Sequence, residues 1–74
     1  MYIRYDQASD ALHIRLKQDM CSESDEINDN IILDFDKDKN VIGIEILDAS
    51  RYLDTDELSS VRFEVSKKID RSSQ

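Results

Sequence analysis

The stretch that decides the fold is residues 31–47, IILDFDKDKNVIGIEIL, in which two apolar runs flank a polar centre. Within each run, β-branched, leucine or phenylalanine residues recur at every second position, the period expected of a β-strand. Asn40, which tolerates a left-handed backbone, lies in the polar centre and suits the loop of a hairpin. We therefore predict two antiparallel strands, over residues 31–35 and 42–47, joined by a short turn.

The same hairpin carries acidic residues at the ligand spacing of a calcium-binding EF-hand loop. The first, third, fifth and twelfth positions of such a loop would be Asp34, Asp36, Asp38 and Glu45. The sixth position requires a glycine for the sharp turn but holds Lys39, and both flanks have strand patterns where the motif needs helices. We interpret the stretch as a hairpin with no metal or other cofactor, and keep metal binding by these four carboxylates, with or without catalysis, as the alternative.

Two more strands are predicted on the N-terminal side. Residues 2–5 are rich in aromatic and β-branched residues, and residues 11–17 alternate strictly between apolar and polar. The polar residues between these segments favour a tight turn. Residues 18–26 are polar and acidic without periodicity, and we predict a loop in which Met20 and Cys21 pack over a sheet edge.

Beyond Ser50 the sequence predicts a helix. Asp54 precedes Glu57 at the spacing of a capping box, and leucines occupy the staple positions on either side of the first turn. Residues 61–66 alternate again, which favours a fifth strand, with continuation of the helix as the alternative. The polar residues 67–74 are expected to fray.

Together these elements predict one compact α+β domain over residues 1–66, a small antiparallel β-meander of four to five strands with one short helix after the fourth. A chain of 74 residues buries only roughly 60% of its unfolded surface, which leaves little room for a deep active-site cleft. The lone cysteine, Cys21, excludes an intramolecular disulfide. Since neither a signal peptide nor an apolar run of membrane length is present, we expect a cytoplasmic protein.

The formal net charge of −7 narrows the choice of partner. Nucleic acids and anionic membranes attract cationic surfaces, so we expect no direct binding to either. The same negative field would attract a basic protein and accelerate its encounter. A homodimer is a further expectation, because sheet edges and outward apolar residues invite pairing; the outward residues are Tyr2, Ile32 and Leu47.

Two segments, residues 5–16 (YDQASDALHIRL) and residues 43–50 (GIEILDAS), resemble the small prokaryotic family catalogued as domain of unknown function 2283. The matching positions are Tyr5, Asp6, Asp10, Leu12, Gly43, Glu45, Asp48, Ala49 and Ser50. The sequence departs from the usual D-x-D-G of the hairpin, where Lys39 and Asn40 stand. The resemblance implies a compact antiparallel sheet with one helical segment. It also implies an antitoxin-like role, because genes of such proteins can lie beside genes of small basic nuclease-like proteins.

No residue pattern points to catalysis. Cys21 lies in an acidic loop that disfavours the thiolate a nucleophile needs, and Ser50 has no identifiable general base beside it. Side-chain bonds to turn amides explain Asp6 and Asp10. If the strands pair in chain order, one polar face collects the best small site available, formed by His13, Arg15, Asp34 and Glu45. A salt-bridged outer face is the simpler interpretation, so we predict a non-catalytic protein-binding module.

Overall fold

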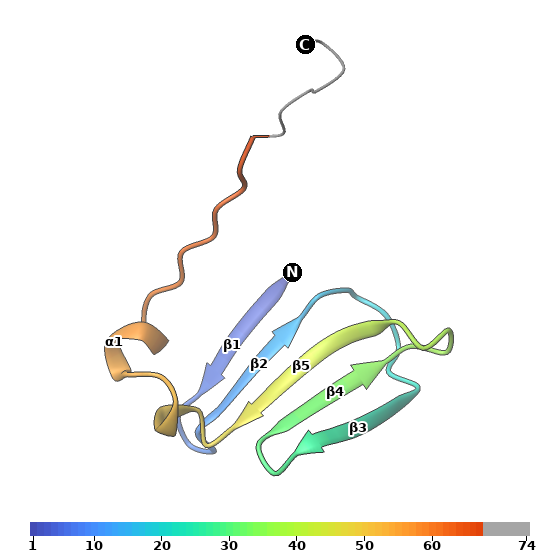
Figure 1. Cartoon of the computed structure of the whole chain (residues 1–74), viewed down its shortest axis with the longest axis horizontal. Helices are drawn as coiled ribbons and strands as arrows, with labels where there is room; N and C mark the ends of the chain where they lie inside the picture. The colour runs from blue at the N-terminus through green and yellow to red at the C-terminus, as the bar shows by residue number, and fades with distance from the viewer. Residues whose placement is uncertain (68–74) are drawn as a thin grey trace.

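The structure, a computed structural model, describes residues 1–67 and consists of one five-stranded antiparallel sheet followed by two short helical turns (Figure 1). The strands are β1 (Tyr2–Asp6), β2 (Ala11–Arg15), β3 (Glu23–Asn28), β4 (Ile31–Phe35) and β5 (Val41–Leu47). A 3-10 turn, η1 (Ala49–Arg51), and a single α-helical turn, α1 (Thr55–Leu58), follow. The predicted antiparallel sheet is confirmed, but the protein is mostly β rather than α+β.

The strand order is β1-β2-β5-β4-β3, so the last strand of the chain occupies the centre of the sheet. β5 pairs with β2 on one side and β4 on the other, both antiparallel. The connection from β2 to β3 therefore passes the ends of β5 and β4, and the Ser22 N–H donates to the Phe35 carbonyl at 2.8 Å. β5 suits the centre because it is the longest strand and holds two of the fully covered residues, Ile42 and Gly43.

Cross-strand register divides the side chains between two faces, since directly opposite residues point to the same side of a sheet. One side, which we call the apolar face, carries two rows that cross four strands. The rows are Ile3, Ile14, Ile44 and Leu33, and Tyr5, Leu12, Ile46 and Ile31. The other side, the polar face, carries His13 opposite Glu45 and Asp34 opposite Gly43.

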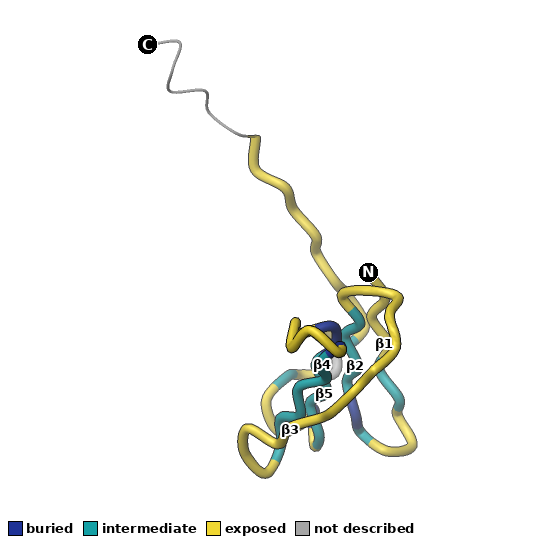
Figure 2. Tube along the Cα trace, turned by 90° about the vertical axis from the view of Figure 1, so that its right-hand side faces the viewer, coloured by how far each residue is buried: buried dark blue, intermediate teal, exposed yellow. Residues whose placement is uncertain are grey.

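The sheet forms a single layer with a small core. Among residues 1–67, the buried hydrophobic residues are Ala11, Ile42 and Ala49. The two apolar rows are only half-buried, and Ile3 is exposed. Along the trace, β4 and β5 are mostly half-buried whereas β3 is exposed throughout (Figure 2). A sheet usually buries its apolar face against a second layer. Here the chain after β5 contributes only a few half-buried side chains to that side, chiefly Leu53 and Leu58.

Two predictions about the ends of the sheet were wrong. Residues 23–28, expected within or after a loop, form the edge strand β3, because β4 offers a free backbone edge and pairing does not require an alternating sequence. Residues 61–66 form neither a strand nor a helix, and the side chains of Val61, Phe63 and Val65 are 64%, 71% and 78% exposed. Their alternation finds no partner strand within the described chain, whose trace leaves the sheet (Figure 1).

Met20 and Cys21 also differ from expectation. Met20 is 84% exposed and Cys21 is exposed, so neither packs over a sheet edge. The fraying expected for residues 67–74 lies outside the described residues, except for Lys67.

The helix predicted after the fourth predicted strand is reduced to the four residues of α1. Its capping pair is present in part, because the Asp54 N–H donates to Glu57 Oε2 at 3.2 Å. The Leu58 N–H closes one α-helical bond to the Asp54 carbonyl at 2.9 Å. A helix this short has little stability of its own, so sequence signals at its start do not ensure further turns.

The hairpin between β4 and β5 is organised by Asp36, which is 4% exposed. Its Oδ1 accepts the backbone N–H groups of Asp38 and Asn40, each at 2.9 Å, and its Oδ2 accepts Asn40 Nδ2 at 3.3 Å. The left-handed residue of the turn is Lys39, with φ of 65°, and not Asn40 as expected. Asn40 serves as a donor to Asp36 instead.

Replacing Lys39 by glycine should stabilise the fold. A residue with a Cβ costs about 1–2 kcal/mol in the left-handed region, whereas glycine loses roughly 0.5–1 kcal/mol more chain entropy on folding. We expect a net gain of about 0.5–1 kcal/mol for Lys39→Gly in urea unfolding. Lys37→Gly is the matched control, since it removes the same charge from a turn position without positive φ, and should destabilise. Equal effects of the two substitutions would contradict the assignment of strain to Lys39.

Candidate functional site

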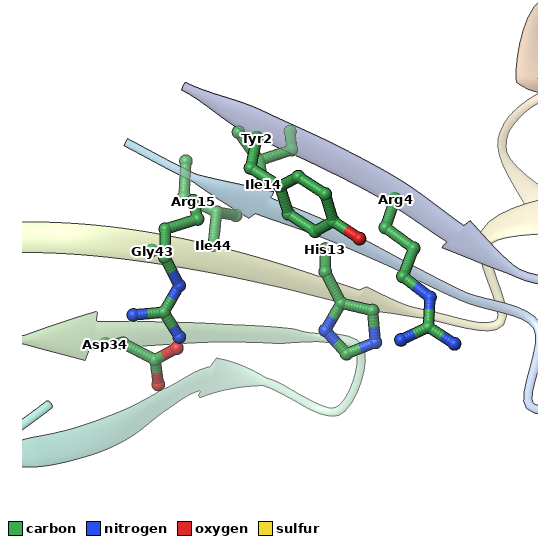
Figure 3. Close-up of a pocket in the computed structure, with 8 residues that line it drawn as sticks. All are labelled: Tyr2, Arg4, His13, Ile14, Arg15, Asp34, Gly43 and Ile44. Carbon is green, nitrogen blue, oxygen red and sulfur yellow. The ribbon is translucent and has the colours of Figure 1, made fainter. Parts of the chain in front are cut away.

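The polar-face residues selected from the sequence do share one face, where a shallow hollow opens over the centre of the sheet (Figure 3). The expected pairing in chain order was wrong, because β5 lies between β2 and β4; this insertion is what brings the four residues together. His13 stands directly opposite Glu45, with 3.7 Å between Nδ1 and Oε1, and Arg15 and Asp34 stand on either side of Gly43. The hollow has a volume of about 200 Å³ and is lined by Tyr2, Arg4, His13, Ile14, Arg15, Asp34, Gly43 and Ile44.

Gly43 helps to create this hollow because it lacks a side chain. A Cβ at this position would lie 3.0 Å from Asp34 Oδ2 and 3.6 Å from the Ile14 carbonyl oxygen. The sequence analysis missed Arg4 as a lining residue. Its place could have been found from the hairpin of β1 and β2, because that pairing sets Arg4 opposite His13.

The chemistry of the hollow suits surface contacts better than enclosure of a substrate. Pockets for small molecules usually span about 300–1,000 Å³, and this one is smaller and open along the sheet. Bases on β1 and β2 face acids on β5 and β4, so charges of both signs are available. The hydroxyl of Ser24 donates to Asp34 Oδ1 at 2.6 Å, which engages that carboxylate in a structural bond.

A second cluster forms around Asp10, at the opposite end of the N-terminal hairpin from residue 2. Asp10 Oδ1 accepts the hydroxyl of Tyr5 at 2.7 Å and the backbone N–H of Ser50 at 3.0 Å, and Oδ2 accepts the Ser50 hydroxyl at 2.6 Å. The Ala49 N–H also donates to the Asp10 carbonyl at 3.0 Å. Asp10 has a φ of 53°, a left-handed conformation that aspartate tolerates.

These hydrogen bonds give a structural role to four of the positions that match the family motif, which are Tyr5, Asp10, Ala49 and Ser50. They tie the turn between β1 and β2 to the chain leaving β5, two places 40 residues apart in sequence. Asp6 closes its own turn by accepting the Ala8 N–H at 3.1 Å, as the sequence predicted. The prediction that Asp10 only serves its local turn was incomplete, because its carboxylate bonds mainly to distant Ser50.

The Asp10 cluster is poorly suited to catalysis. Hydrogen bonds from Ser50, then from Tyr5, hold the pKa of the Asp10 carboxyl below its usual 3.8. The bond to Asp10, then desolvation, raises the pKa of Tyr5 above its usual 10.0. A general base works best with a pKa near the operating pH, whereas the hydrogen bonds lower the pKa of Asp10 further below neutral pH. Ser50 therefore lies beside a carboxylate that has little tendency to take its proton.

Asn30, which the sequence analysis did not single out, secures the same C-terminal end of β5 from the turn between β3 and β4. Its Nδ2 donates to the Leu47 carbonyl at 3.3 Å and to Asp48 Oδ2 at 3.2 Å, and its Oδ1 accepts the hydroxyl of Tyr52 at 2.9 Å. Asp48 is itself left-handed, with φ of 52°. No single-residue signal marks Asn30, since its partners come from residues 47–52.

The metal hypothesis gains no support from residues 1–67, where no three His, Cys, Asp or Glu side chains gather in an arrangement that could hold a metal ion. Asp36 already accepts three hydrogen bonds within its turn. Asp34 and Glu45 point to the polar face from different strands, where each has another partner.

The comparisons with known proteins identify the family. Residues 2–50 match the model of a family described as a protein of unknown function, DUF2283, and the chain belongs to that family. The match spans β1 to β5 and ends at Ser50, the partner of Asp10. No curated protein and no solved structure matches the chain. Within the described residues, no helix is long and apolar enough to cross a membrane.

Acid should destabilise the fold through Asp10 and Asp36. Hydrogen bonds, chiefly from Ser50 to Asp10 and from the Asn40 N–H to Asp36, hold the pKa of each carboxyl below its ordinary value of 3.8. A lowered folded-state pKa contributes stability that is present above the unfolded-state value and is lost as the pH falls through the folded-state value. We expect the melting temperature to drop below about pH 3.8. This loss of stability is measured by thermal melts, followed by circular dichroism at a series of pH values from about 2 to about 7.

In Asp10→Asn the melting temperature should be lower at neutral pH and should fall less steeply in acid. Asp56→Asn, a change at an exposed carboxylate on α1, is the control and should follow the wild-type curve. An unchanged acid slope in Asp10→Asn would show that its hydrogen bonds do not contribute to acid stability.

Millimolar calcium or manganese should leave the melting temperature unchanged relative to chelator. A ligand that binds only the folded state raises the midpoint with concentration, so even weak binding is detectable. A rise that saturates with metal and disappears in Asp34→Asn would restore the metal hypothesis. Asp54→Asn, outside the hairpin, provides the matched control.

Proposed function

We propose that this chain is a non-catalytic protein-binding module that captures a basic protein at the edge strand β3. The observation that carries the proposal is the character of this strand. β3 lies at one edge of the sheet, all six of its residues are exposed, and three of them are acidic: Glu23, Asp25 and Glu26.

An edge strand offers backbone groups as well as charge. β3 pairs with β4 on one side only, so the N–H and C=O groups of its outer side are available to an added strand. Peptides bind many domains in this way, with main-chain bonds supplying affinity and side chains supplying specificity. The register shift between Glu26 and Asn28 interrupts the ladder near one end, which limits an added strand to the part before it.

The charge of this edge selects the partner. No lysine or arginine occurs between Lys17 and Lys37 in the sequence, a stretch that includes all of β3 and β4. Carboxylates on β3 would repel the same strand of another copy, because like charges opposite one another destabilise a strand pair. A strand carrying lysine or arginine would instead be attracted, and its association would be accelerated by the negative field.

An antitoxin-like role is one form of this function, in which the captured partner is a small basic protein. The acidic edge and the net charge of −7 support it. The non-catalytic character is supported by the Asp10 cluster, whose hydroxyl and carboxylate groups serve to join the hairpin to β5.

The test begins with capture of partners by the tagged protein from its own host's lysate, followed by intact mass measurement of any complex. A stoichiometric basic partner is expected. The triple substitution Glu23→Lys, Asp25→Lys and Glu26→Lys should weaken its binding at least tenfold by titration calorimetry, through lost attraction and new repulsion at the edge.

The control changes the same net charge at exposed acidic residues away from β3, with Asp38→Lys, Asp56→Lys and Glu64→Lys. It should retain most of the affinity. If both triple variants weakened binding equally, net charge alone would explain the loss of affinity, and a binding site at β3 would be contradicted. Absence of any stoichiometric partner would remove the proposal itself.

A further inference from the structure

The apolar face is the largest feature of this molecule that the proposed function does not use. Its two rows cross β1, β2, β5 and β4, and among these eight described side chains none is charged. α1 and the residues before it border the half of the face over β1 and β2, where Leu53 and Leu58 help to line a groove of about 550 Å³. The patch over β5 and β4 has no such cover; it consists of Ile31, Leu33, Ile44 and Ile46.

We propose that a second copy of this chain covers the apolar face, so that two sheets pack face to face about a twofold axis. This inference does not depend on the function proposed for β3, which lies at an edge of the sheet. It follows from the layer rule, since a sheet with one apolar face needs a second layer and residues 1–67 of this chain supply only one. Two copies would form the two layers of a sandwich, with side chains of both apolar faces filling a core about 10 Å thick.

The area available is sufficient for a specific dimer. The four strands that the rows cross, at about 4.8 Å spacing and with five residues each at about 3.4 Å rise, give a face of roughly 19 by 17 Å, or about 320 Å² of footprint per copy. Residues 61–65 add exposed apolar side chains beside this face, and a phenylalanine alone can bury about 150–250 Å². Two copies would thus bury roughly 1,000 Å², about the minimum area of a biological interface.

Residues 61–67, the described part of the C-terminal segment, do not provide the same cover. They leave α1 on the β1 side, where Phe63 shares a small groove with Met1 and Ile3. Five extended residues reach about 17 Å and cover the width of one strand, about 4.8 Å. Within residues 1–67, the isoleucine-rich patch over β5 and β4 stays open to a second layer from another molecule.

The charge distribution favours a second copy over the basic partner at this face. The four strands that the two rows cross offer a basic protein no carboxylate, and the rows of two copies meet without repulsion despite the net charge of −7. The carboxylates on this side of the sheet belong to β3, where Asp25 and Glu23 stand opposite Leu33 and Phe35. Acidic residues are concentrated at β3. A twofold axis parallel to the strands would place β3 of one copy over β1 of the other and keep the two β3 strands apart.

The first test is the mass of the wild-type protein in solution, by sedimentation at concentrations from about 1 to 100 µM, a range that resolves micromolar dissociation constants. Twice the 8.6 kDa of one chain at the higher concentrations is the expected result. A species of one chain throughout, or an assembly larger than two, would overturn the proposal. The sample contains no partner protein, so this result tests the dimer alone and does not depend on whether β3 binds a basic protein.

Two matched substitutions then locate the interface. Ile44→Lys puts a charge at the centre of the apolar face and should raise the dimer dissociation constant at least tenfold. Ile32→Lys makes the same change at a half-buried residue of the polar face and should leave dimerisation within about threefold of wild type. The reverse result would place the interface on the polar face and contradict the proposal.

If Ile44→Lys fails to fold by circular dichroism, a milder pair of variants gives the same answer. In a Cys21→Ser background, Ile44→Cys should be crosslinked between copies by a short bis-maleimide, because β5 lies at the centre of the face. Ile32→Cys should yield monomer under the same conditions. Crosslinking of Ile32→Cys alone would overturn the assignment of the face.

Discussion

The pairing of β2 with β5 is the constraint on which the rest of this structure depends. It joins the N-terminal hairpin to the three strands that follow, and it places the most covered strand at the centre. The Asp10 carboxylate reinforces the same junction from outside the ladder, by accepting hydrogen bonds from Ser50 and Tyr5. The family match ends at Ser50 and so includes both partners of this junction.

Insertion of β5 between β2 and β4 also creates the two faces and the two edges. The alternation of each strand then brings Ile14, Ile44 and Leu33 into one row and sets His13 against Glu45 on the other side. Each surface has a distinct chemistry, with an apolar face that carries no charge on β1, β2, β5 and β4, a polar face of mixed charge and an acidic edge at β3. The two proposed contacts use different parts of the sheet, because a second copy would cover these four strands and a basic protein would add to the outer edge of β3.

Sequence patterns performed well where a strand has one apolar face. The hairpin of β4 and β5 and the strand β2 were predicted close to their observed bounds, since period-two alternation reflects half-burial directly. The patterns failed at β3, whose six residues are all exposed and thus carry no alternation. They failed again at residues 61–66, where an alternating sequence forms no strand because alternation cannot supply a partner.

The candidate site shows the same division. The sequence by itself determined which residues are acidic, which strands alternate, and which side chains of one strand share a side, because side-chain direction follows from position along a strand. Only the tertiary structure decided that β5 pairs with both β2 and β4, that Asp10 bonds to Ser50, and that residues 1–67 place no second layer on the apolar face. These features depend on strand order and on contacts between residues far apart in the chain, and neither can be predicted from the local sequence pattern.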